Sequence, residues 1–335
     1  MVDLEVDDRR IPYERVMGSA KTQLLSISKK ADSPLVTISL LVDKEKVQVS
    51  PTLIHNIIGD ALKDIVFGHL FPIPFIASAE RTGAAIFRNE LNWSRDRYRQ
   101  QMGSALDIDE GRMLANIYFG YAFPVQENIE FVGRLGTLLK RDSYIYENHS
   151  EVLDDFSDIL GGVYLVTEND ELYYIPKGKS IRLTMSESSS SVRSLLNIGF
   201  YLRHVAAPGD LLMVDEPELN LHPENQRRVA RLFARLVNVG IKVLITTHSD
   251  YIIKELNTLI MLNQEGERFN KIAEHEGYRP AELLDAGKVR VYIAENSTLV
   301  PASIDPKMGI EVRSFDTTIE DMNRVQGEIV WGGDE

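Results

Sequence analysis

Apolar residues in the second half of the chain follow two periods in turn. Residues 211–214 and 241–246 are short apolar runs rich in aliphatic side chains, which is typical of buried strands. Between them, residues 223–239 show helical spacing of apolar positions, at Val229, Leu232, Phe233 and Leu236. Pro223 suits the first turn of this helix, and Gly240 ends it. Strand, helix and strand in this order predict a right-handed crossover between parallel strands.

The flanking segments extend this prediction of an α/β fold. Downstream, we expect a helix over residues 250–256 and a short strand over residues 259–262. Upstream, "GVYLVTENDELYYIP" has two β-rich runs around a polar turn, which predicts a hairpin. "KSIRLT" adds a third strand to this small antiparallel element. The stretch "MSESSSSVRSLLNIGFYLRH" is a serine-rich turn that runs into a helix.

The first half of the chain shows weaker patterns. Residues 35–49 alternate and are β-branched, which predicts one or two strands. Helical spacing follows at Leu53, Ile57, Ile58, Leu62 and Ile65. "PIPFIAS" predicts a short buried strand that ends before Glu80 and Arg81. Residues 86–160 are mainly helical with long charged faces, which we interpret as an inserted helical arm.

These elements predict four parts of the chain. Residues 1–82 would form a partial N-terminal lobe, and residues 83–160 a helical arm or insertion. Residues 161–305 would form a C-terminal lobe, and residues 306–335 a tail that frays after about residue 325.

Composition narrows the class of protein. The 335 residues are 44% hydrophobic and 26% charged, which is ordinary for a globular protein and enough for a sizeable core. The absence of cysteine excludes disulfides and cysteine-ligated zinc, and it fits a reducing cytoplasm. "MVDLEVDDRRIP" is not a signal peptide, and no run reaches the roughly 18 apolar residues of a membrane span. We therefore expect a cytoplasmic protein with no membrane partner. The net charge of -13 does not indicate a nucleic-acid-binding surface, although it leaves room for a local basic groove.

Two carboxylates and a histidine are predicted to meet at one edge of the sheet. Asp215 and Glu216 come directly after the first apolar run, and His248 follows the second. Because the carboxyl ends of parallel strands open at the same edge, these side chains converge there. One carboxylate can hold Mg²⁺ through its water shell, and the next can orient or deprotonate a water. A histidine can hydrogen-bond a γ-phosphate or that water.

At these residues the sequence resembles a known family. "LLMVDEPELNLHP" followed by "VLITTHS" is similar to the Walker B, D-loop and H-loop motifs of ABC-type ATPases. The resemblance is to the soluble group with OLD, RecF and SMC proteins, often described as AAA-family ATPases. Within that group, "DEPELNLHPENQR" resembles stand-alone ATPases, many of them in bacterial anti-phage systems. The resemblance covers residues 180–262 well and residues 35–82 loosely, and the helical arm matches none of its motifs. It implies a P-loop NTPase-like parallel sheet with flanking helices, which binds ATP with Mg²⁺.

The resemblance also implies a role for each matching residue. Asp215 would be the Mg²⁺-linked aspartate, Glu216 the catalytic glutamate and His248 the switch histidine. Asn220, Leu221 and His222 would occupy the D-loop, where transporters more often have Leu-Asp. The serine-rich turn lies where the family has its signature motif, which faces the nucleotide of a partner subunit. That turn supplies Ser186, Ser188, Ser189, Ser190 and Arg193, with serines in place of the usual glycines.

A phosphate-binding loop of the form G-x-x-x-x-G-K-[ST] is absent from the sequence. The nearest candidate is "GSAKT", from Gly18 to Thr22, but Ala20 stands where the second glycine is needed. No apolar strand precedes it. We reject this candidate, so truncation, a loop supplied by another polypeptide and true loss of ATP binding remain open.

At several positions an ordinary structural role is an alternative to the functional one. Ser249 and the serine turn are also suitable helix N-caps, and His222 can be a turn residue that packs on Pro223. The pair Glu80-Arg81 can reach a nucleotide or a dimer face, or form a surface ion pair. A solvated face is the simpler interpretation of two basic stretches that DNA or a partner could also contact. These are the helical arginines Arg227, Arg228, Arg231 and Arg235, and the arm arginines Arg95, Arg97 and Arg99, which alternate with Trp93 and Tyr98.

The sequence therefore gives three candidate functions. The first is an ABC-type ATPase that dimerises head to tail, as a homodimer or with a partner ATPase subunit. It would couple nucleotide state to a partner, such as an effector nuclease or toxin in anti-phage defence. The second is a non-catalytic scaffold or binding subunit without a phosphate loop. The third is a DNA-repair or maintenance ATPase of the RecF or SMC type.

Overall fold

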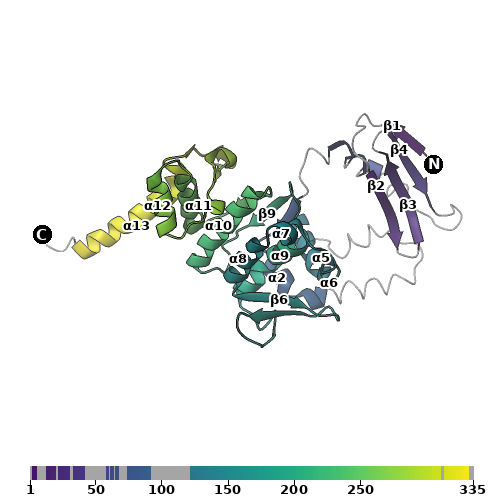
Figure 1. Ribbon diagram of the computed structural model, residues 1–335, viewed down its shortest axis with the longest axis horizontal. Coiled ribbons are helices and arrows are strands. Elements are labelled where there is room, and N and C mark those ends of the chain that lie inside the picture. The colour runs from purple at the N-terminus through teal and green to yellow at the C-terminus, as the bar shows by residue number, and fades with distance from the viewer. Residues whose placement is uncertain are drawn as a thin grey trace. The chain divides into compact units, whose positions relative to one another are not determined.

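The chain divides into two compact units, which are described separately. The computed structural model describes residues 2–5, 13–19, 22–30, 33–41, 58–59, 61–63, 65–67, 74–91, 121–310 and 313–331. The first unit comprises Met1–Pro74 and Phe87–Gln126, and the second comprises Phe75–Ile86 and Glu127–Glu335. Figure 1 shows the elements of both, coloured from purple at the N-terminus to yellow at the C-terminus.

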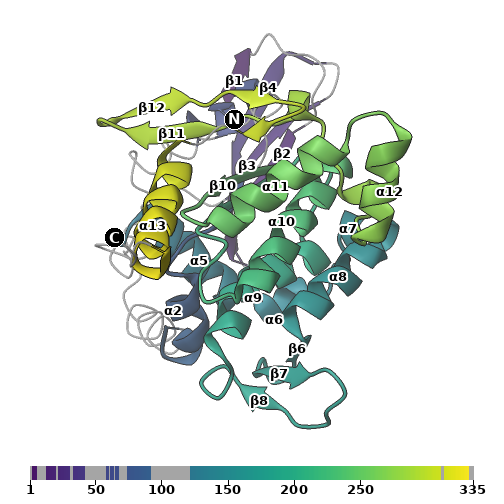
Figure 2. The same cartoon turned by 90° about the vertical axis from the view of Figure 1, so that its left-hand side faces the viewer.

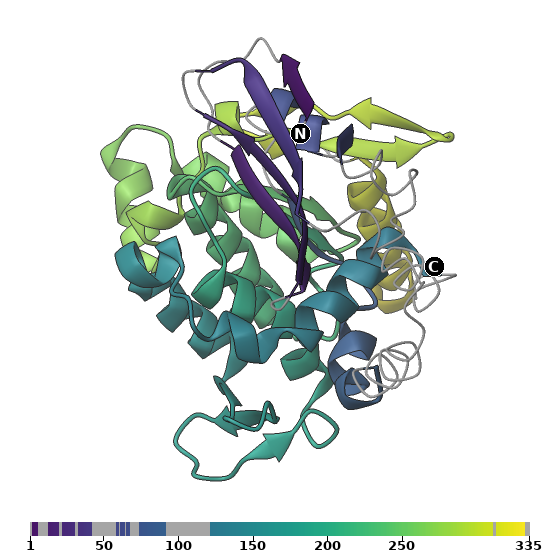
Figure 3. The same cartoon turned by 90° about the vertical axis from the view of Figure 1, so that its right-hand side faces the viewer.

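The first unit contains an antiparallel sheet with the strand order β1-β4-β3-β2. Its strands, drawn in purple in Figure 3, are β1 Val2–Glu5, β2 Tyr13–Ser19, β3 Thr22–Lys29 and β4 Leu35–Leu40. Ile27, Val36 and Ile38 of this sheet form a core with Ala61 and Ile65, which lie in helical turns. The predicted strand from residue 35 and the predicted helix around residue 62 are therefore confirmed in their described parts. Residues 42–50, the second half of the predicted strand region, lie outside the described residues.

The rejected phosphate-loop candidate lies in a hairpin of this sheet. Gly18 pairs with Gln23, and Ser19 pairs with Thr22, between the antiparallel strands β2 and β3. A phosphate loop joins a strand to a helix, whereas Gly18, Ser19 and Thr22 belong to two paired strands, which supports the rejection.

The second unit contains the predicted parallel strands. β9 (Leu211–Asp215) and β10 (Lys242–Thr246) pair in parallel, with Asp215 opposite Thr246. β5 (Pro74–Ala77) lies on the other side of β9, so the sheet order is β10-β9-β5. This parallel pair in a mixed α/β unit fits the expected P-loop NTPase-like fold. Because the pair is parallel and in register, the C-terminal ends of β9 and β10 lie side by side.

The helix between these strands has the predicted apolar face. α10 spans Pro223–Asn238 and packs between α8 (Ser150–Leu160) and α11 (Asp250–Leu262), as Figure 2 shows. All four side chains that define its predicted apolar face are buried: Val229, Leu232, Phe233 and Leu236. His222 caps the N-terminus through its ring nitrogen, and Pro223 occupies the first turn.

The long helix α9 (Ser190–His204) is buried along almost its whole length. Its neighbour α8 approaches closely at Gly199, where an added Cβ would lie 2.7 Å from the Phe156 ring. The absence of a side chain at residue 199 is what allows this approach.

The structure divides the helical region differently from the predicted insertion at residues 83–160. After α2 (Arg81–Ile86), the second unit includes most of α5 (Phe123–Gly133), then α6 (Leu135–Leu138), α7 (Tyr144–Asn148) and α8. α6, α7 and α8 pack on α9, and α8 also packs on α10. Helical spacing shows that a face is buried but not what buries it, so the sequence pattern alone suggested a separate arm.

The small antiparallel element is confirmed. β6 (Gly162–Val166) pairs with β7 (Leu172–Pro176), and β7 pairs with the short β8 (Leu183–Thr184). Asp170 in the polar turn has a φ of 62°, a left-handed conformation that aspartate adopts more readily than most residues.

Two predictions for the C-terminal region are wrong. Residues 259–262 continue α11 instead of forming a strand, with Leu259, Ile260 and Leu262 buried in a core with Tyr278 and Leu284. A short apolar run has no clear period, so helix and strand could not be told apart there. The predicted tail contains a helix, α13 (Arg313–Trp331), which extends beyond residue 325.

The remaining elements complete the C-terminal part of the second unit. They are α12 (Glu267–His275), the 3₁₀ turns η1 (Pro280–Glu282) and η2 (Ala286–Lys288), and the pairs β11 (Tyr292–Glu295) with β12 (Thr298–Pro301) and β13 (Ile304–Asp305) with β14 (Gly309–Ile310). Across the described parts of the chain, no helix combines the length and apolar character needed to cross a bilayer.

Candidate functional site

The ends of β9 and β10 are joined through Asp215, Glu216 and Thr246. The Thr246 hydroxyl donates a short hydrogen bond to the Asp215 carboxylate. The Glu216 N–H donates to the Thr246 carbonyl at 3.0 Å and also lies 3.2 Å from its hydroxyl oxygen. The two strand ends thus meet where the sequence placed them, and Thr246 ties the acidic pair to the next strand.

Glu216 has an unusual backbone conformation. Its φ is 46°, in the left-handed region that non-glycine residues rarely adopt. Among the described residues, nothing forms a hydrogen bond or ion pair with its half-buried carboxylate. A strained residue with an uncommitted carboxylate at the edge of a sheet is typical of functional positions.

Glu218 is a site residue that the sequence analysis missed. Its carboxylate accepts from the Thr247 hydroxyl at 2.8 Å and from the His248 backbone N–H at 2.7 Å. Glu218 therefore fixes the loop that follows β10. The available signal was its spacing in "DEPE", two residues after Glu216, but only the fold brings it to residues 247 and 248.

His248 is held through its backbone and not through its ring. The side chain is exposed, and within the described segments no group hydrogen-bonds the imidazole. The loop is also anchored at Ser249, which accepts from the Ile252 N–H at 3.2 Å and donates to the Gln226 side chain at 2.5 Å. The interpretation of Ser249 as an N-cap is confirmed, and the His248 ring is free to meet a ligand.

The capping interaction of Ser249 gives a first prediction. Ser249→Ala removes the cap of α11 and the bond to Gln226, so the free energy of unfolding should fall by about 1–2 kcal/mol. Denaturant unfolding followed by circular dichroism measures this change. Ser157→Ala, which removes a part-buried hydroxyl bonded to the Gly162 carbonyl outside this loop, is the matched control. An equal or smaller loss in Ser249→Ala would contradict the capping role.

Arg81 is fully buried beneath the acidic pair. Its guanidinium donates to the carbonyl oxygens of Asp215 at 2.6 Å and of Glu216 at 2.9 Å. Burial lowers the pKa of Arg81 to about 10, although the carboxylates of Asp215, Glu218, Glu216 and Glu80 favour its charged form. A pKa of about 10 leaves the group protonated at neutral pH. The suggested surface ion pair at Arg81 is therefore wrong, and this arginine is an internal part of the site.

The predicted D-loop residues have local structural roles. Asn220 is exposed and has a φ of 61°, which suits asparagine in a tight turn. Leu221 is buried, and the His222 ring accepts from the Glu224 N–H at 3.4 Å. These contacts shape the turn into α10 and agree with the interpretation of His222 as a turn residue.

The serine-rich turn starts α9. Ser189 is the N-cap and accepts from the Val192 N–H at 3.3 Å. Ser188 is buried and donates to the Thr184 carbonyl at 2.7 Å, whereas Ser186 is exposed and contacts the Thr184 hydroxyl at 2.9 Å. The turn is thus closed by its own hydrogen bonds, with Ser186 and Ser189 on its exposed side.

Arg193 folds back onto the same turn. Its guanidinium donates to the Met185 carbonyl at 2.9 Å, to the Ser188 carbonyl at 2.5 Å and to the Ser190 hydroxyl at 3.0 Å. This side chain braces the turn from within, so any ligand of the turn would meet serines that are already ordered.

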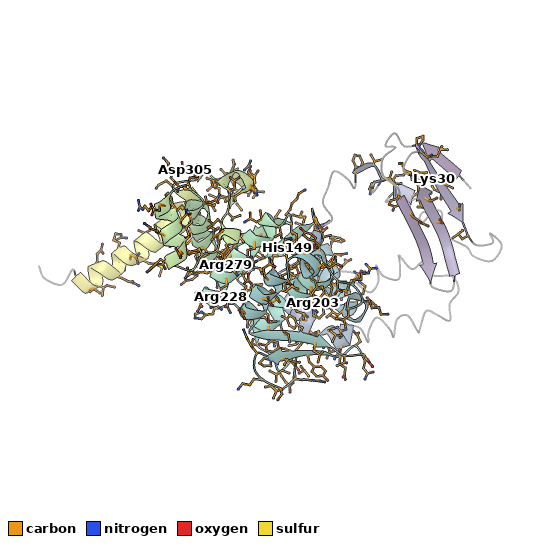
Figure 4. All side chains as sticks on the ribbon, viewed as in Figure 1. Lys30, His149, Arg203, Arg228, Arg279 and Asp305 are labelled. Carbon is orange, nitrogen blue, oxygen red and sulfur yellow. The ribbon has the colours of Figure 1, made fainter. Side chains whose placement is uncertain are left out.

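The arginines of α10 are mostly committed to ion pairs inside the unit. Arg227 and Arg231 both donate to the carboxylate of Glu255, which is only 3% exposed, at 2.6 and 2.5 Å. Arg235 pairs with Glu151 and Asp155. Arg228, labelled in Figure 4, lies on the exposed face with Glu224 as its partner, and the Arg227 side chain is about equally exposed, at 46% against 47%. The interpretation of this helix as a solvated basic face is therefore wrong for Arg231 and Arg235, whose side chains are 20% and 5% exposed. Arg95, Arg97 and Arg99 lie outside the described residues.

Among the described residues, the carboxylates at the ends of β9 and β10 do not form a complete set of metal ligands. In the ranges that the structure describes, no group of three or more histidine, aspartate or glutamate side chains is placed to hold an ion. The donor chemistry instead suits a nucleotide-bound Mg²⁺, which keeps several waters and takes only one or two carboxylates in addition to phosphate oxygens. Asp215, half-buried at the edge of the sheet, can supply such a carboxylate.

Comparison with known families supports an ATPase domain. Residues 112–253 match the family model of the AAA ATPase domain. The matched range includes Asp215, Glu216 and His248. Such a domain binds a nucleotide, typically with Mg²⁺. No curated protein matches the sequence.

Solved structures of SMC heads show a weak likeness. One, from work on ATP-driven dimerization and DNA-stimulated activation of SMC ATPases, is 15% identical with a TM-score of 0.31, over 53% of this chain and 96% of that chain. An Smc head bound to the C-winged helix domain of ScpA is 12% identical with a TM-score of 0.29, over 69% of this chain and 61% of that chain. The Smc head with an extended coiled coil, bound to the C-terminal domain of ScpA from Pyrococcus furiosus, is 17% identical with a TM-score of 0.23, over 69% of this chain and 67% of that chain. At these values the likeness assigns no role to any residue.

Proposed function

We propose that the second unit supplies the metal and water side of an ATP-hydrolysing site. The observation that carries this proposal is the joined end of β9 and β10, where Asp215, Glu216 and the His248 loop meet. The match of residues 112–253 to the AAA ATPase domain supports the same conclusion independently of this geometry.

Each residue then has a defined task. Asp215 would hold a nucleotide-bound Mg²⁺, which would neutralise charge on the phosphates. The uncommitted carboxylate of Glu216 accepts a hydrogen bond from the attacking water and orients it toward the γ-phosphate. His248 donates from its ring to a phosphate oxygen or to the same water. Thr246 and Glu218 keep the two strand ends in register while these groups act.

The sequence contains no G-x-x-x-x-G-K-[ST] motif, so this proposal requires the phosphate-binding half of the site to come from another polypeptide segment. The finer parts of the proposal rest on the motif resemblance. They are a head-to-tail dimer in which the serine turn faces the partner's nucleotide, and coupling to a nuclease or toxin in anti-phage defence.

Asp215→Asn tests the metal role directly. In the native protein, we expect this change to weaken Mg²⁺–ATP binding about 10- to 100-fold, because a neutral amide is a poor partner for a hydrated Mg²⁺. Binding of ATP in excess EDTA should not change. Isothermal titration calorimetry measures both affinities.

Asp158→Asn is the matched control, since Asp158 pairs with Lys177 on the surface, where both side chains are more than half exposed. An Asp215→Asn variant that binds Mg²⁺–ATP as tightly as this control would contradict the assignment.

A non-catalytic scaffold is the second candidate, favoured by the absence of a phosphate-loop motif from the sequence. Titration of Mg²⁺–ATP into the 335-residue chain alone separates the two. Micromolar binding would refute the scaffold, whereas no binding by this chain and no turnover by the native protein would favour it.

A further inference from the structure

Arg81 holds both peptide groups that flank Glu216. One guanidinium nitrogen donates to the Asp215 carbonyl at 2.6 Å, and the other donates to the Glu216 carbonyl at 2.9 Å. The first carbonyl belongs to the peptide plane before the Glu216 Cα, and the second to the plane after it. When both planes are fixed, φ and ψ of Glu216 are fixed, and so is the direction of its side chain.

The conformation held in this way is one that Glu216 would not adopt unaided. A left-handed residue with a Cβ costs about 1–2 kcal/mol, and the φ of Glu216 is 46°. The peptide before it is held from both sides, since its N–H donates to the Thr246 carbonyl at 3.0 Å while its carbonyl accepts from Arg81. Without Arg81, only the side toward β10 would remain fixed.

Arg81 is itself immobilised by two other elements. Its Nε donates to the Ser194 carbonyl of α9 at 2.8 Å, and its Nη1 donates to the Ser78 carbonyl at 2.9 Å. The Ser78 hydroxyl in turn accepts from Asn128 at 3.1 Å, and Asn128 accepts from Asn197 of α9 at 2.7 Å. α9 therefore reaches the guanidinium directly and also through the buried amides.

We propose that Arg81 is the positioning residue that aims the Glu216 carboxylate at the attacking water and couples that aim to α9. This inference rests on the proposed hydrolytic function. The same helix links Arg81 to the serine turn. α9 begins at that turn, and Arg81 contacts α9 one helical turn further along. A shift of α9 on ligand binding at the turn moves the guanidinium, and with it both peptide planes of Glu216.

Lysine cannot replace Arg81 in this role. An ammonium keeps the charge but lacks the planar fork that donates to several carbonyls in fixed directions. Arg81→Lys thus separates positioning from electrostatics. The matched control is Arg235→Lys, because Arg235 is also buried, at 5% exposure, but bonds Glu151 and Asp155 and none of the site carbonyls.

Hydrogen–deuterium exchange tests the positioning without any need for turnover. In the 335-residue chain, Arg81→Lys should raise exchange of the Glu216 and Leu219 amides at least tenfold. The Glu216 amide donates to the Thr246 carbonyl from a peptide whose own carbonyl Arg81 holds, and the Leu219 amide donates to the Glu216 carbonyl, which Arg81 also holds. Arg235→Lys should leave both amides as in the wild type. Unchanged exchange in Arg81→Lys would overturn the proposal.

A wild-type measurement covers the case in which Arg81→Lys does not fold. By NMR, the Arg81 guanidinium protons should exchange slowly and show contacts to the backbones of Glu216 and Ser194. Rapidly exchanging protons without these contacts would overturn the proposal.

A double-mutant cycle in the native protein tests the consequence for hydrolysis. Arg81→Lys should lower kcat about a hundredfold, as expected for a misplaced catalytic group, with little change in the KM for ATP. In the Glu216→Gln background, Arg81→Lys should have no further effect. Equal losses in both backgrounds would overturn the positioning role alone. If Glu216→Gln itself left turnover unchanged, the proposed function would fail instead, so the two failures are distinguishable.

Discussion

Glu216→Gln is expected to lower the kcat for ATP hydrolysis by about 10²- to 10⁴-fold, the range over which a positioned general base accelerates a reaction. Glutamine has nearly the same shape as glutamate but is neutral, so it cannot accept the proton of the attacking water. The backbone at residue 216 should keep its conformation, because Arg81 and Thr246 contact only main-chain atoms of Glu216. Binding of ATP should therefore survive, and the loss should appear in kcat and not in KM.

The measurement is steady-state phosphate release by the native protein. The matched control is Glu267→Gln, because Glu267 is an exposed residue of α12 that pairs with Lys271 on the surface of the same helix. Turnover of Glu216→Gln within twofold of this control would remove Glu216 from the mechanism. Loss of ATP binding together with turnover would point instead to a structural defect.

Glu255→Gln is expected to lower the free energy of unfolding by about 3 kcal/mol, the lower end of the range for breaking a buried ion pair. Glu255 is 3% exposed and accepts from Arg227 at 2.6 Å and from Arg231 at 2.5 Å. An amide in its place would turn N–H groups toward two guanidinium ions. The loss stays at the lower end because Arg227 is 46% exposed and can recover hydration.

Glu224→Gln is the control for this prediction. Glu224 also pairs with an arginine of α10, but its side chain is 61% exposed and that of Arg228 is 47% exposed. Such a surface pair contributes only about 0.3–0.5 kcal/mol. Urea unfolding of both variants measures the difference between the two losses. If they were equal, the Glu255 pair would be no more than a surface interaction, and the joint between α10 and α11 would depend on apolar packing.

The elements that the sequence predicted well are those whose local pattern is strong. α10 has a proline in its first turn, a regular apolar face and a glycine just after it, and every predicted face residue is buried. The two flanking strands follow from the same logic, since a helix of this length between short apolar runs is typical of a crossover between parallel strands. The same pattern places Asp215 and the His248 loop at one edge of the sheet.

Predictions failed where the pattern was short or where a partner far along the chain decided the outcome. Residues 259–262 are apolar without a clear period, and only their packing against Tyr278 and Leu284 shows that they are helical. Arg81 stands in a polar turn of the sequence, but the fold encloses it completely between α9 and β9. Arg231 and Arg235 appeared to belong to a solvated charge run because their carboxylate partners on α11 and α8 are remote from them in sequence.

The sequence by itself determined the order of strand, helix and strand, the acidic pair at the first strand end and the histidine after the second. It did so because strand and helix periods, turn residues and parallel connections are local or nearly local constraints. Only the tertiary structure decided how Glu216 is aimed, which residue holds the His248 loop and where Arg81 lies. These properties depend on hydrogen bonds between residues 30 to 135 positions apart, and no local period records them.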